Sequence, residues 1–370
     1  MGLTLRMTAA FMLCCALGAC SLPRGAALQS EIVGVGQDET PEFAHYQVTR
    51  DLLPGIASWP AGKHASKKRN WIKGGRGASG PILAAGDIVK IAIWENGENK
   101  LLTTEGVPSA NLQTMRVSSS GNLFVPYVGQ VRVAGMSPDA ARAKIEEMLT
   151  PLIPAAQVQL DSEPGQGNAV DLVSGVMRPG SVPMQDRSMT VLGLISQGGG
   201  VQPSIENPQL RLIRGSSVYE ISMQRVLDEP SLDTGLRPGD KLIVEKDPRY
   251  FMALGASGRE EIIPFPQDEV TALEAVTLAG GISDTRANPR GILILREYPS
   301  SAVRAEGLGG PEHERVVFSI DLTSTDGLFS AQNFHVQPKD LVLATESSAT
   351  SLRTILQLVG TSIGVANRLD

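Results

Sequence analysis

The chain has 370 residues, more than a single hydrophobic core usually organises, and this length predicts about two to four modules. Its formal net charge is −6, and this acidity argues against a nucleic-acid-binding protein, which favours a basic surface. Aromatic residues make up 4% of the chain, which argues against a module that binds sugars on exposed aromatic rings. The 39 glycines and 24 prolines predict many tight turns and therefore many short strands.

The first 20 residues have the pattern of a secretory signal. Arg6 supplies a positive start, and the apolar run at 7–17 is too short to span a membrane. Small residues then lead directly into Cys20. All three cysteines lie within this segment, so nothing after it can form a disulfide or a thiolate metal site. Cys20 stands where a cysteine with a function of its own would follow a signal. The alternative interpretation is an ordinary signal peptide in which this cysteine occurs by chance.

Residues 21–80 show no sustained periodicity, because prolines and glycines interrupt it, and we expect an irregular segment. The stretch 75–80 fits the spacing G-x-G-x-x-G. No strand precedes it and no helix is predicted after it, whereas a dinucleotide site requires both. We therefore exclude a dinucleotide site at this position.

The most informative pattern lies at 118–149. Residues 122–128 predict a strand, Gly129 begins a short turn, and 131–133 alternate as a half-buried strand does. Ser137 is placed to cap a helix that starts at the next residue and ends before a proline. Four apolar residues share one face of this helix by their spacing: Ala141, Ile145, Met148 and Leu149.

An internal repeat follows. Residues 190–201 align with 271–282 at a constant shift of 81, and each copy predicts a short helix that ends at glycines. In the second copy, Thr271 and Glu274 form a capping box. A strand is expected after each helix, at 210–213 and 292–295, and the repeat is an architectural signal rather than a catalytic one.

A turn sequence recurs with the repeat. Residues 236–240 match 336–340, and each copy leads into a strand. The Pro-Gly pair of the first copy suits the centre of a type II turn. Residues 85–87 are a third and weaker copy of this turn.

The segment 347–370 has the pattern of an amphipathic helix at about 100° per residue. Six apolar residues share one arc: Leu352, Ile355, Leu356, Val359, Ile363 and Ala366. The opposite arc is polar and includes Arg353, Gln357, Thr361 and Arg368, and two glycines lie beside it at G-x-x-x-G spacing, Gly360 and Gly364. About 18 helical residues reach roughly 27 Å, close to the hydrocarbon thickness of a membrane. From the residues alone, a helix docked on the protein or lying on a membrane is the favoured interpretation.

No catalytic pattern stands out. The four histidines are scattered, without the helical spacing of a metal site, and there is no nucleophile elbow. Carboxylates are too numerous for the sequence to exclude a glycosidase pair. We expect no enzyme activity, no metal and no cofactor.

Residues 85–95 together with 118–149 resemble the polysaccharide biosynthesis/export domain of outer-membrane export lipoproteins from Gram-negative bacteria. The repeat is similar to the soluble-ligand-binding β-grasp (SLBB) modules of that family, and residues 17–20 resemble its lipobox. The resemblance implies an α+β fold with these segments: a lipoprotein signal peptide at 1–20, an irregular segment at 21–80, the export domain at 81–165, β-grasp-like repeats at 168–247 and 248–345, and a C-terminal amphipathic transmembrane helix at 347–370.

The resemblance implies an outer-membrane channel subunit that exports capsular or extracellular polysaccharide by passive conduction. Cys20 would carry the lipid, and Ser21 in place of an aspartate indicates the outer membrane, with the bulk of the chain in the periplasm. About eight subunits would form a homo-oligomeric ring. In that ring the apolar arc of the C-terminal helix would face lipid, the polar arc would face the lumen, and the two glycines would pack neighbouring helices. This helix departs from the usual pattern because it lacks a Trp or Tyr at either membrane interface.

The resemblance implies several partners: the exported polysaccharide, further copies of the chain, outer-membrane lipid, and an inner-membrane chain-length-control (copolymerase) protein that docks on the export domain. No nucleic acid is expected. Two other functions remain open from the sequence. One is a periplasmic polysaccharide-binding adaptor lipoprotein that forms no pore, and the other is a polysaccharide-degrading enzyme.

Overall fold

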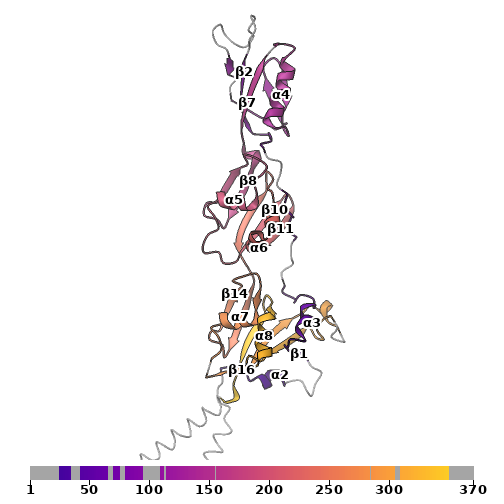
Figure 1. Ribbon diagram of the computed structural model, residues 1–370, viewed down its shortest axis with the longest axis vertical. Coiled ribbons are helices and arrows are strands. Elements are labelled where there is room, and N and C mark those ends of the chain that lie inside the picture. Colours follow the sequence, from indigo (N-terminus) through magenta and orange to yellow (C-terminus); the bar gives the residue numbers. More distant parts are fainter. Residues whose placement is uncertain are drawn as a thin grey trace, which may run out of the picture. The chain divides into compact units, whose positions relative to one another are not determined.

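The computed structural model describes residues 25–34, 42–65, 70–75, 80–94, 109–111, 114–154, 156–283, 285–304 and 309–349. The chain divides into two compact units, one formed by Lys67–Asp247 and the other by Met1–Ser66 with Pro248–Asp370. Both units mix helices and strands, as the sequence predicts (Figure 1).

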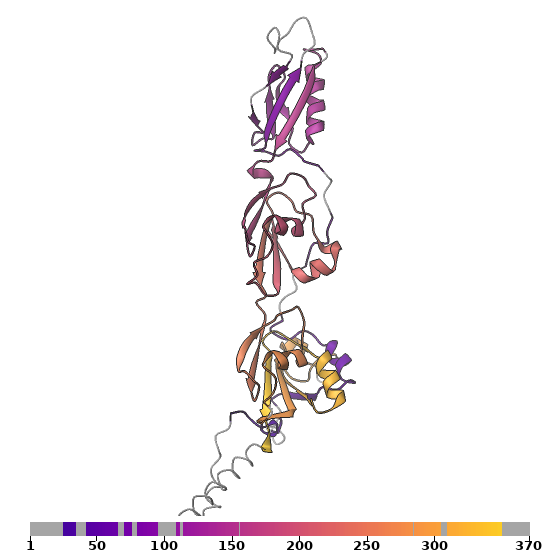
Figure 2. The same ribbon diagram turned by 60° about the vertical axis from the view of Figure 1, so that its left-hand side comes forward.

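The export domain contains an antiparallel sheet and one long helix. Strand β2 (Ile88–Trp94) is central and pairs along its whole length with β7 (Gln157–Glu163). Two shorter strands also pair with β2, namely β3 (Ser109–Asn111) and β4 (Met115–Arg116). Helix α4 (Pro138–Leu149) lies beside β7 (Figure 2).

Helix α4 begins as predicted, because the Ser137 hydroxyl accepts a hydrogen bond from the Ala140 N–H at 3.1 Å. Its residues Ala141, Ile145 and Leu149 are buried in the core of the domain. The prediction for Met148 is wrong, since this side chain is 40% exposed. Met148 lies about 60° around the helix from Ile145, at the edge of the arc that meets the sheet.

The hairpin that precedes α4 also differs from its prediction. Strand β5 (Asn122–Val125) ends three residues early, the turn lies at 126–128, and Gly129 begins β6 (Gly129–Arg132). Pro126 lacks the N–H that a ladder position needs, and Tyr127 adopts the left-handed conformation with φ of 66°. The chain therefore reverses before the glycine rather than at it.

The first repeat forms a five-stranded sheet in the order β11-β10-β12-β8-β9. Its elements are β8 (Ala169–Ser174), β9 (Gly180–Pro183), α5 (Val191–Gln197), β10 (Pro208–Arg214), β11 (Ser217–Ser222), α6 (Met223–Asp228) and β12 (Lys241–Lys246). The expected strand at 210–213 is part of β10.

The second repeat has the same order, β17-β16-β19-β13-β14, and one further strand. Its elements are β13 (Tyr250–Gly255), β14 (Glu261–Pro264), β15 (Val270–Thr271), α7 (Ala272–Leu278), β16 (Ala287–Glu297), β17 (Arg315–Ile320), α8 (Thr325–Asn333), β18 (His335–Val336) and β19 (Leu341–Glu346). The matching strand orders show that the sequence repeat is a repeat of topology.

The further strand comes from the N-terminal segment, for which the sequence predicts no regular structure. This segment contains α2 (Gln29–Val33), β1 (Ala44–Gln47) and α3 (Leu53–Ala57). Strand β1 extends the sheet of the second repeat by pairing in parallel with β17. Isolated strands of this length carry a weak periodic signal, and the pairing depends on a partner distant in sequence.

The glycine pairs end their helices as predicted. Gly200 and Gly281 are both left-handed, with φ of 86° and 81°. The Gly200 N–H donates to the Ile195 carbonyl, and the Gly281 N–H makes the equivalent bond to Val276. The capping box of Thr271 and Glu274 at the start of α7 is also confirmed.

Candidate functional site

The site residues predicted from the sequence lie outside the described residues. Cys20 precedes residue 25, and the apolar, polar and glycine positions of the C-terminal helix follow residue 349. Across the ranges that the structure describes, no helix has the length and apolar character needed to cross a membrane. The described residues that lie nearest in sequence to these two segments contact each other.

The contact is made at Glu346, the last residue of β19, by residues near the start of the described chain. The Ala26 N–H donates to Glu346 Oε2 at 3.3 Å, and the Glu346 N–H donates to the Ala27 carbonyl at 3.1 Å. Leu28 and Glu346 form an isolated parallel bridge. Glu346 is buried, although it is a carboxylate, and these backbone bonds explain its position. The chain that follows Cys20 and the chain that enters the C-terminal segment are therefore joined at the end of β19.

Arg286 supports the same junction. Its carbonyl accepts a hydrogen bond from the Ser347 N–H at 2.8 Å, which directs the chain as it leaves β19. Its guanidinium lies beside Gly25, where a Cβ would stand 3.5 Å from the nearest guanidinium nitrogen. Gly25 and Ser347, near the two ends of the described chain, thus both lie against Arg286, which directly precedes β16.

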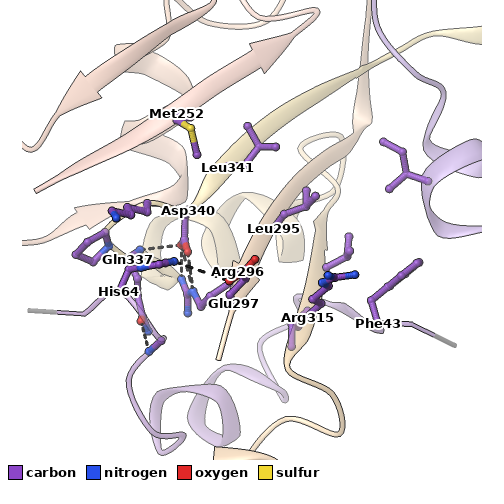
Figure 3. Close-up of a pocket in the computed structure, with 16 residues that line it drawn as sticks. Phe43, His64, Met252, Leu295, Arg296, Glu297, Arg315, Gln337, Asp340 and Leu341 are labelled. Carbon is purple, nitrogen blue, oxygen red and sulfur yellow. Dashed lines mark hydrogen bonds and ion pairs between the residues drawn. The ribbon is translucent and has the colours of Figure 1, made fainter. Parts of the chain in front are cut away.

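A buried ion pair organises the other end of the sheet in the second repeat. Arg296 Nη2 lies 2.7 Å from Asp340 Oδ2, and Arg296 Nε lies 3.1 Å from both carboxylate oxygens (Figure 3). The two side chains are 3% and 2% exposed. Burial raises the pKa of Asp340, and the Arg296 guanidinium opposes that rise. Burial alone would lower the pKa of Arg296, and attraction to Asp340 raises it instead, so the guanidinium stays charged.

Aspartate also closes the turn on which this pair rests. Asp340 Oδ2 accepts a hydrogen bond from the Gln337 N–H at 2.8 Å. The first repeat has the same arrangement, with Arg214 Nη2 2.6 Å from Asp240 Oδ2 and the Arg237 N–H 2.8 Å from the same oxygen. In each repeat the aspartate carboxylate therefore accepts hydrogen bonds both from the backbone of the turn and from an arginine on a strand.

The third copy of the turn, in the export domain, keeps the first of these two roles. Asp87 Oδ2 accepts a hydrogen bond from the Ala84 N–H at 2.7 Å. Its other oxygen accepts from the Gly165 N–H, also at 2.7 Å, where the repeats have an arginine. The weak resemblance of residues 85–87 to the repeat turns thus has a structural basis.

Comparison with known proteins identifies the architecture. Residues 77–162 match the model of the polysaccharide biosynthesis/export protein family, and residues 172–244 match the SLBB domain. The chain is 28% identical to the capsule polysaccharide export protein BexD of Haemophilus influenzae, over 78% of this chain and 76% of BexD. It is 26% identical to the capsule polysaccharide export outer membrane protein CtrA of Neisseria meningitidis, over 95% of this chain and 93% of CtrA.

The chain thus carries an export domain of the polysaccharide export family, followed by an SLBB domain. A further relative, the EPS I polysaccharide export outer membrane protein EpsA of Ralstonia solanacearum, is 25% identical over 75% of this chain and 74% of EpsA. The matched regions of the family correspond to the sheet with α4 and to the first repeat. The second repeat lies beyond both regions and repeats the SLBB strand order.

The buried carboxylates of the described residues have structural partners, and these residues show no metal-binding cluster. No group of three or more His, Cys, Asp or Glu side chains among the described residues is placed to hold a metal ion. The most buried carboxylates accept hydrogen bonds from turn backbone or from arginines: Asp87, Asp240 and Asp340. These three carboxylates therefore support the turns of the fold.

Sequence reasoning missed Glu346, Arg286 and the two arginine–aspartate pairs. A signal was present for the pairs, because Arg214 and Arg296 each lie in the last two residues of the strand that follows a glycine-ended helix. The two arginines are one position further apart in sequence than the repeat shift of 81, so an alignment of the two repeats without gaps does not match them. No local signal identifies Glu346, whose partners lie 320 residues away.

Proposed function

We propose that this chain is an outer-membrane subunit for the export of capsular or extracellular polysaccharide. The observation that carries the proposal is the similarity along nearly the whole chain to CtrA, which is named as a capsule polysaccharide export outer membrane protein. The role is transport rather than catalysis, and it requires no cofactor.

Lipid attachment is the first part of the proposed mechanism. Cys20 carries the lipid and holds the protein at the outer membrane, with the bulk of the chain in the periplasm. Ala26 is six positions after Cys20, so the Cα of the lipidated residue lies at most about 22 Å from the Cα of Ala26, which bonds Glu346 at the end of β19. The junction at Glu346 supports this arrangement, since it sets the anchored segment beside the start of the C-terminal segment.

The C-terminal helix forms the second part. Residues 347–370 cross the outer membrane, with Leu352, Ile355 and Leu356 among the lipid-facing residues and Arg353 and Gln357 toward a hydrated lumen. A single helix with such a polar face is unfavourable in lipid, and a ring of about eight copies hides that face. Polysaccharide moves through the ring by passive conduction.

The proposed division of labour follows the six segments given by the sequence. The export domain at 81–165 is the end that receives the polymer and docks an inner-membrane copolymerase. The two β-grasp repeats at 168–247 and 248–345 form the wall of the channel in the periplasm. The ring of C-terminal helices forms the part of the channel that crosses the membrane.

The test is the mass of the lipidated protein after detergent extraction, measured by light scattering with the detergent contribution subtracted. A discrete mass near eight chains supports the ring. A monomer or dimer contradicts it and favours an adaptor that binds polysaccharide without forming a pore. Deleting 347–370 separates the same alternatives in cells: export stops if the helix forms the pore and continues if the protein is an adaptor.

A further inference from the structure

A mainly apolar cavity of about 470 Å³ lies on the sheet of the second repeat (Figure 3). Its wall comes from the sheet residues Met252, Leu295, Val317 and Leu341. Each of these alternates along its strand with residues of the hydrophobic core, such as Phe251, Ile294 and Val342, so the cavity opens on the face opposite the core. Its volume lies within the range of about 300–1,000 Å³ that is usual for small-molecule sites.

The apolar wall is particular to the second repeat. Met252 pairs with Leu341 across the sheet, and the same register position of the first repeat holds Asp171 paired with Lys241. The equivalence is fixed by the backbone, because the N–H groups of Met252 and Asp171 donate to the carbonyls of Asp340 and Asp240. The fold accepts charged residues at these two positions, so the second repeat does not need apolar ones for its stability.

The N-terminal segment adds a second wall to the cavity. Ile32, Phe43 and His64 contribute side chains to the cavity. The stretch beside His64 is fixed to the rim: the Gly62 N–H donates to Gln337 Oε1 at 2.6 Å, and the Lys63 N–H donates to the Glu297 carbonyl at 2.8 Å. The cavity is therefore built from two parts of the chain that are held together.

The rim carries one ammonium group that no acidic partner neutralises. Lys63 pairs with Glu297 at 3.0 Å, and Arg315 pairs with Glu42 at 3.6 Å. Lys339, which also lines the cavity, has no ion-pair partner among the described residues. Inside the cavity, Arg296 and Asp340 neutralise each other.

Lys339 occupies its position against a backbone preference. Its φ is 66°, and the matching residue of the first repeat is Gly239, with φ of 83°. The two N–H groups make equivalent bonds, to the carbonyls of Tyr250 and Ala169. Residues other than glycine rarely adopt this backbone conformation, and residues strained in this way concentrate at functional sites. The second repeat thus keeps a strained lysine at the mouth of an apolar cavity.

We propose that this cavity binds a single-chain anionic amphiphile. The alkyl chain lies against Met252, Leu295 and Leu341, and the head group, a carboxylate or a phosphate, meets the ammonium of Lys339. An apolar chain gains from leaving water, and a cation at the rim favours an anionic head over a neutral or cationic one. The site is independent of the proposed export channel.

The experiment is native mass spectrometry of the full mature chain in a nonionic detergent. The probes are dodecanoate, dodecyl phosphate and dodecyltrimethylammonium, each below its micelle-forming concentration. We expect one dodecanoate or dodecyl phosphate per chain, and the tighter of the two identifies the head group. Equal binding of the cationic probe overturns the proposal, as does the absence of an adduct.

Two variants and one control locate the site. Met252→Asp copies Asp171 of the first repeat and should weaken dodecanoate binding about tenfold or more, because it sets a carboxylate in the apolar wall. Lys339→Gln should lower the preference for the anionic over the cationic probe about fivefold. Lys241→Gln, at the start of β12 in the first repeat, should change neither.

Thermal melting of each variant checks the fold. If Met252→Asp has a much lower melting temperature than the unmodified protein, the test of the site rests on the head-group preference of Lys339→Gln alone. Dodecanoate binding that survives Met252→Asp in a folded protein, or an unchanged preference in Lys339→Gln, overturns the assignment.

Discussion

Arg296 contacts Asp340 through two nitrogens, although 44 residues separate them in sequence. The pair joins β16 to the turn before β19, and Arg214 joins β10 to the matching turn before β12 in the same way. An arginine that bonds a carboxylate through two nitrogens fixes orientation as well as distance. The pair therefore sets the position of the turn that enters the central strand of each repeat.

Removing one partner of the buried pair should destabilise the second repeat. Arg296→Met leaves the Asp340 carboxylate buried without its cation, and we expect a loss of about 3–5 kcal/mol in unfolding free energy. The double variant with Asp340→Asn should recover part of that loss, because the amide still accepts the Gln337 N–H. Urea unfolding of the full chain measures both.

Arg211→Met provides the matched control. Arg211 bonds Glu220 and Glu245 at 2.8 and 2.6 Å on an exposed face, with 36% of its own side chain accessible. Exposed pairs contribute at most about 1 kcal/mol. An equal loss in the two single variants would contradict the role given to the buried pair.

Relieving the strain at Lys339 should stabilise the protein. Lys339→Gly restores the residue of the first repeat, and the gain should be about 0.5–1 kcal/mol, since the left-handed cost exceeds the entropy that glycine adds to the unfolded chain. Differential scanning calorimetry should show a higher melting temperature. A lower one would mean that the lysine side chain stabilises the turn.

Two glycines of the repeats tolerate no side chain. Gly175 and Gly255 are left-handed, with φ of 81° and 87°, and a Cβ on either would collide with a carbonyl oxygen, of Val244 and Ala344 respectively. Gly255→Ala should cost more than about 2 kcal/mol, because steric overlap adds to conformational strain. Gly129 is the control, since its φ is 85° and nothing lies within 4 Å of its Cβ position. Urea unfolding should show that Gly129→Ala costs only about 1 kcal/mol.

The capping box of α7 should respond to pH. The pKa of Glu274 lies below its ordinary value of 4.5, chiefly because the Thr271 N–H donates to its carboxylate. A depressed pKa means that the cap contributes stability above pH 4.5 and loses it as the pH falls further. Hydrogen exchange in the peptide 271–279 should therefore quicken, relative to its intrinsic rate, between pH 5.5 and about 3.5. Glu274→Ala should exchange about twofold to fivefold faster at pH 6 and show little of this pH dependence.

The anchor makes a prediction in cells. Cys20→Ser removes the proposed lipid, and the protein should leave the outer-membrane fraction for the soluble periplasmic fraction. Immunoblotting of separated fractions measures the change. Full retention at the outer membrane would mean that the C-terminal segment suffices and that the anchor is secondary.

The repeat and its helix ends were predictable because their signals are local. Glycine pairs, the capping box at Thr271 and the serine before α4 each act over a few residues, and the structure confirms them. The hairpin at 122–132 was misread because Pro126 looks like part of a strand, while the lack of its N–H ends the ladder there. Met148 was predicted to be buried for a similar reason. Helical spacing gives the angular position of a residue on the helix, but it does not give the width of the helix face that the sheet covers.

Other features depend on partners far away in sequence. Strand β1 is four residues long, and its pairing with β17 leaves no periodic trace in either segment. Glu346 reads as one more charged residue after a strand, yet it is buried by the chain around Ala26. The cavity likewise needs residues from both parts of its unit, so no single stretch predicts it.

The parallel pairing of β1 with β17 also constrains the order in which the chain folds. His45 and Ser319 are bonded across a separation of 274 residues, so the sheet of the second repeat stays incomplete until almost the whole polypeptide has been made and delivered. The intervening unit is one continuous stretch of chain and can fold earlier. Contacts between distant residues also close slowly. Until they close, residues 42–65 and the edge of β17 remain unpaired, and this interval is when the protein is most exposed to proteases and to chaperones.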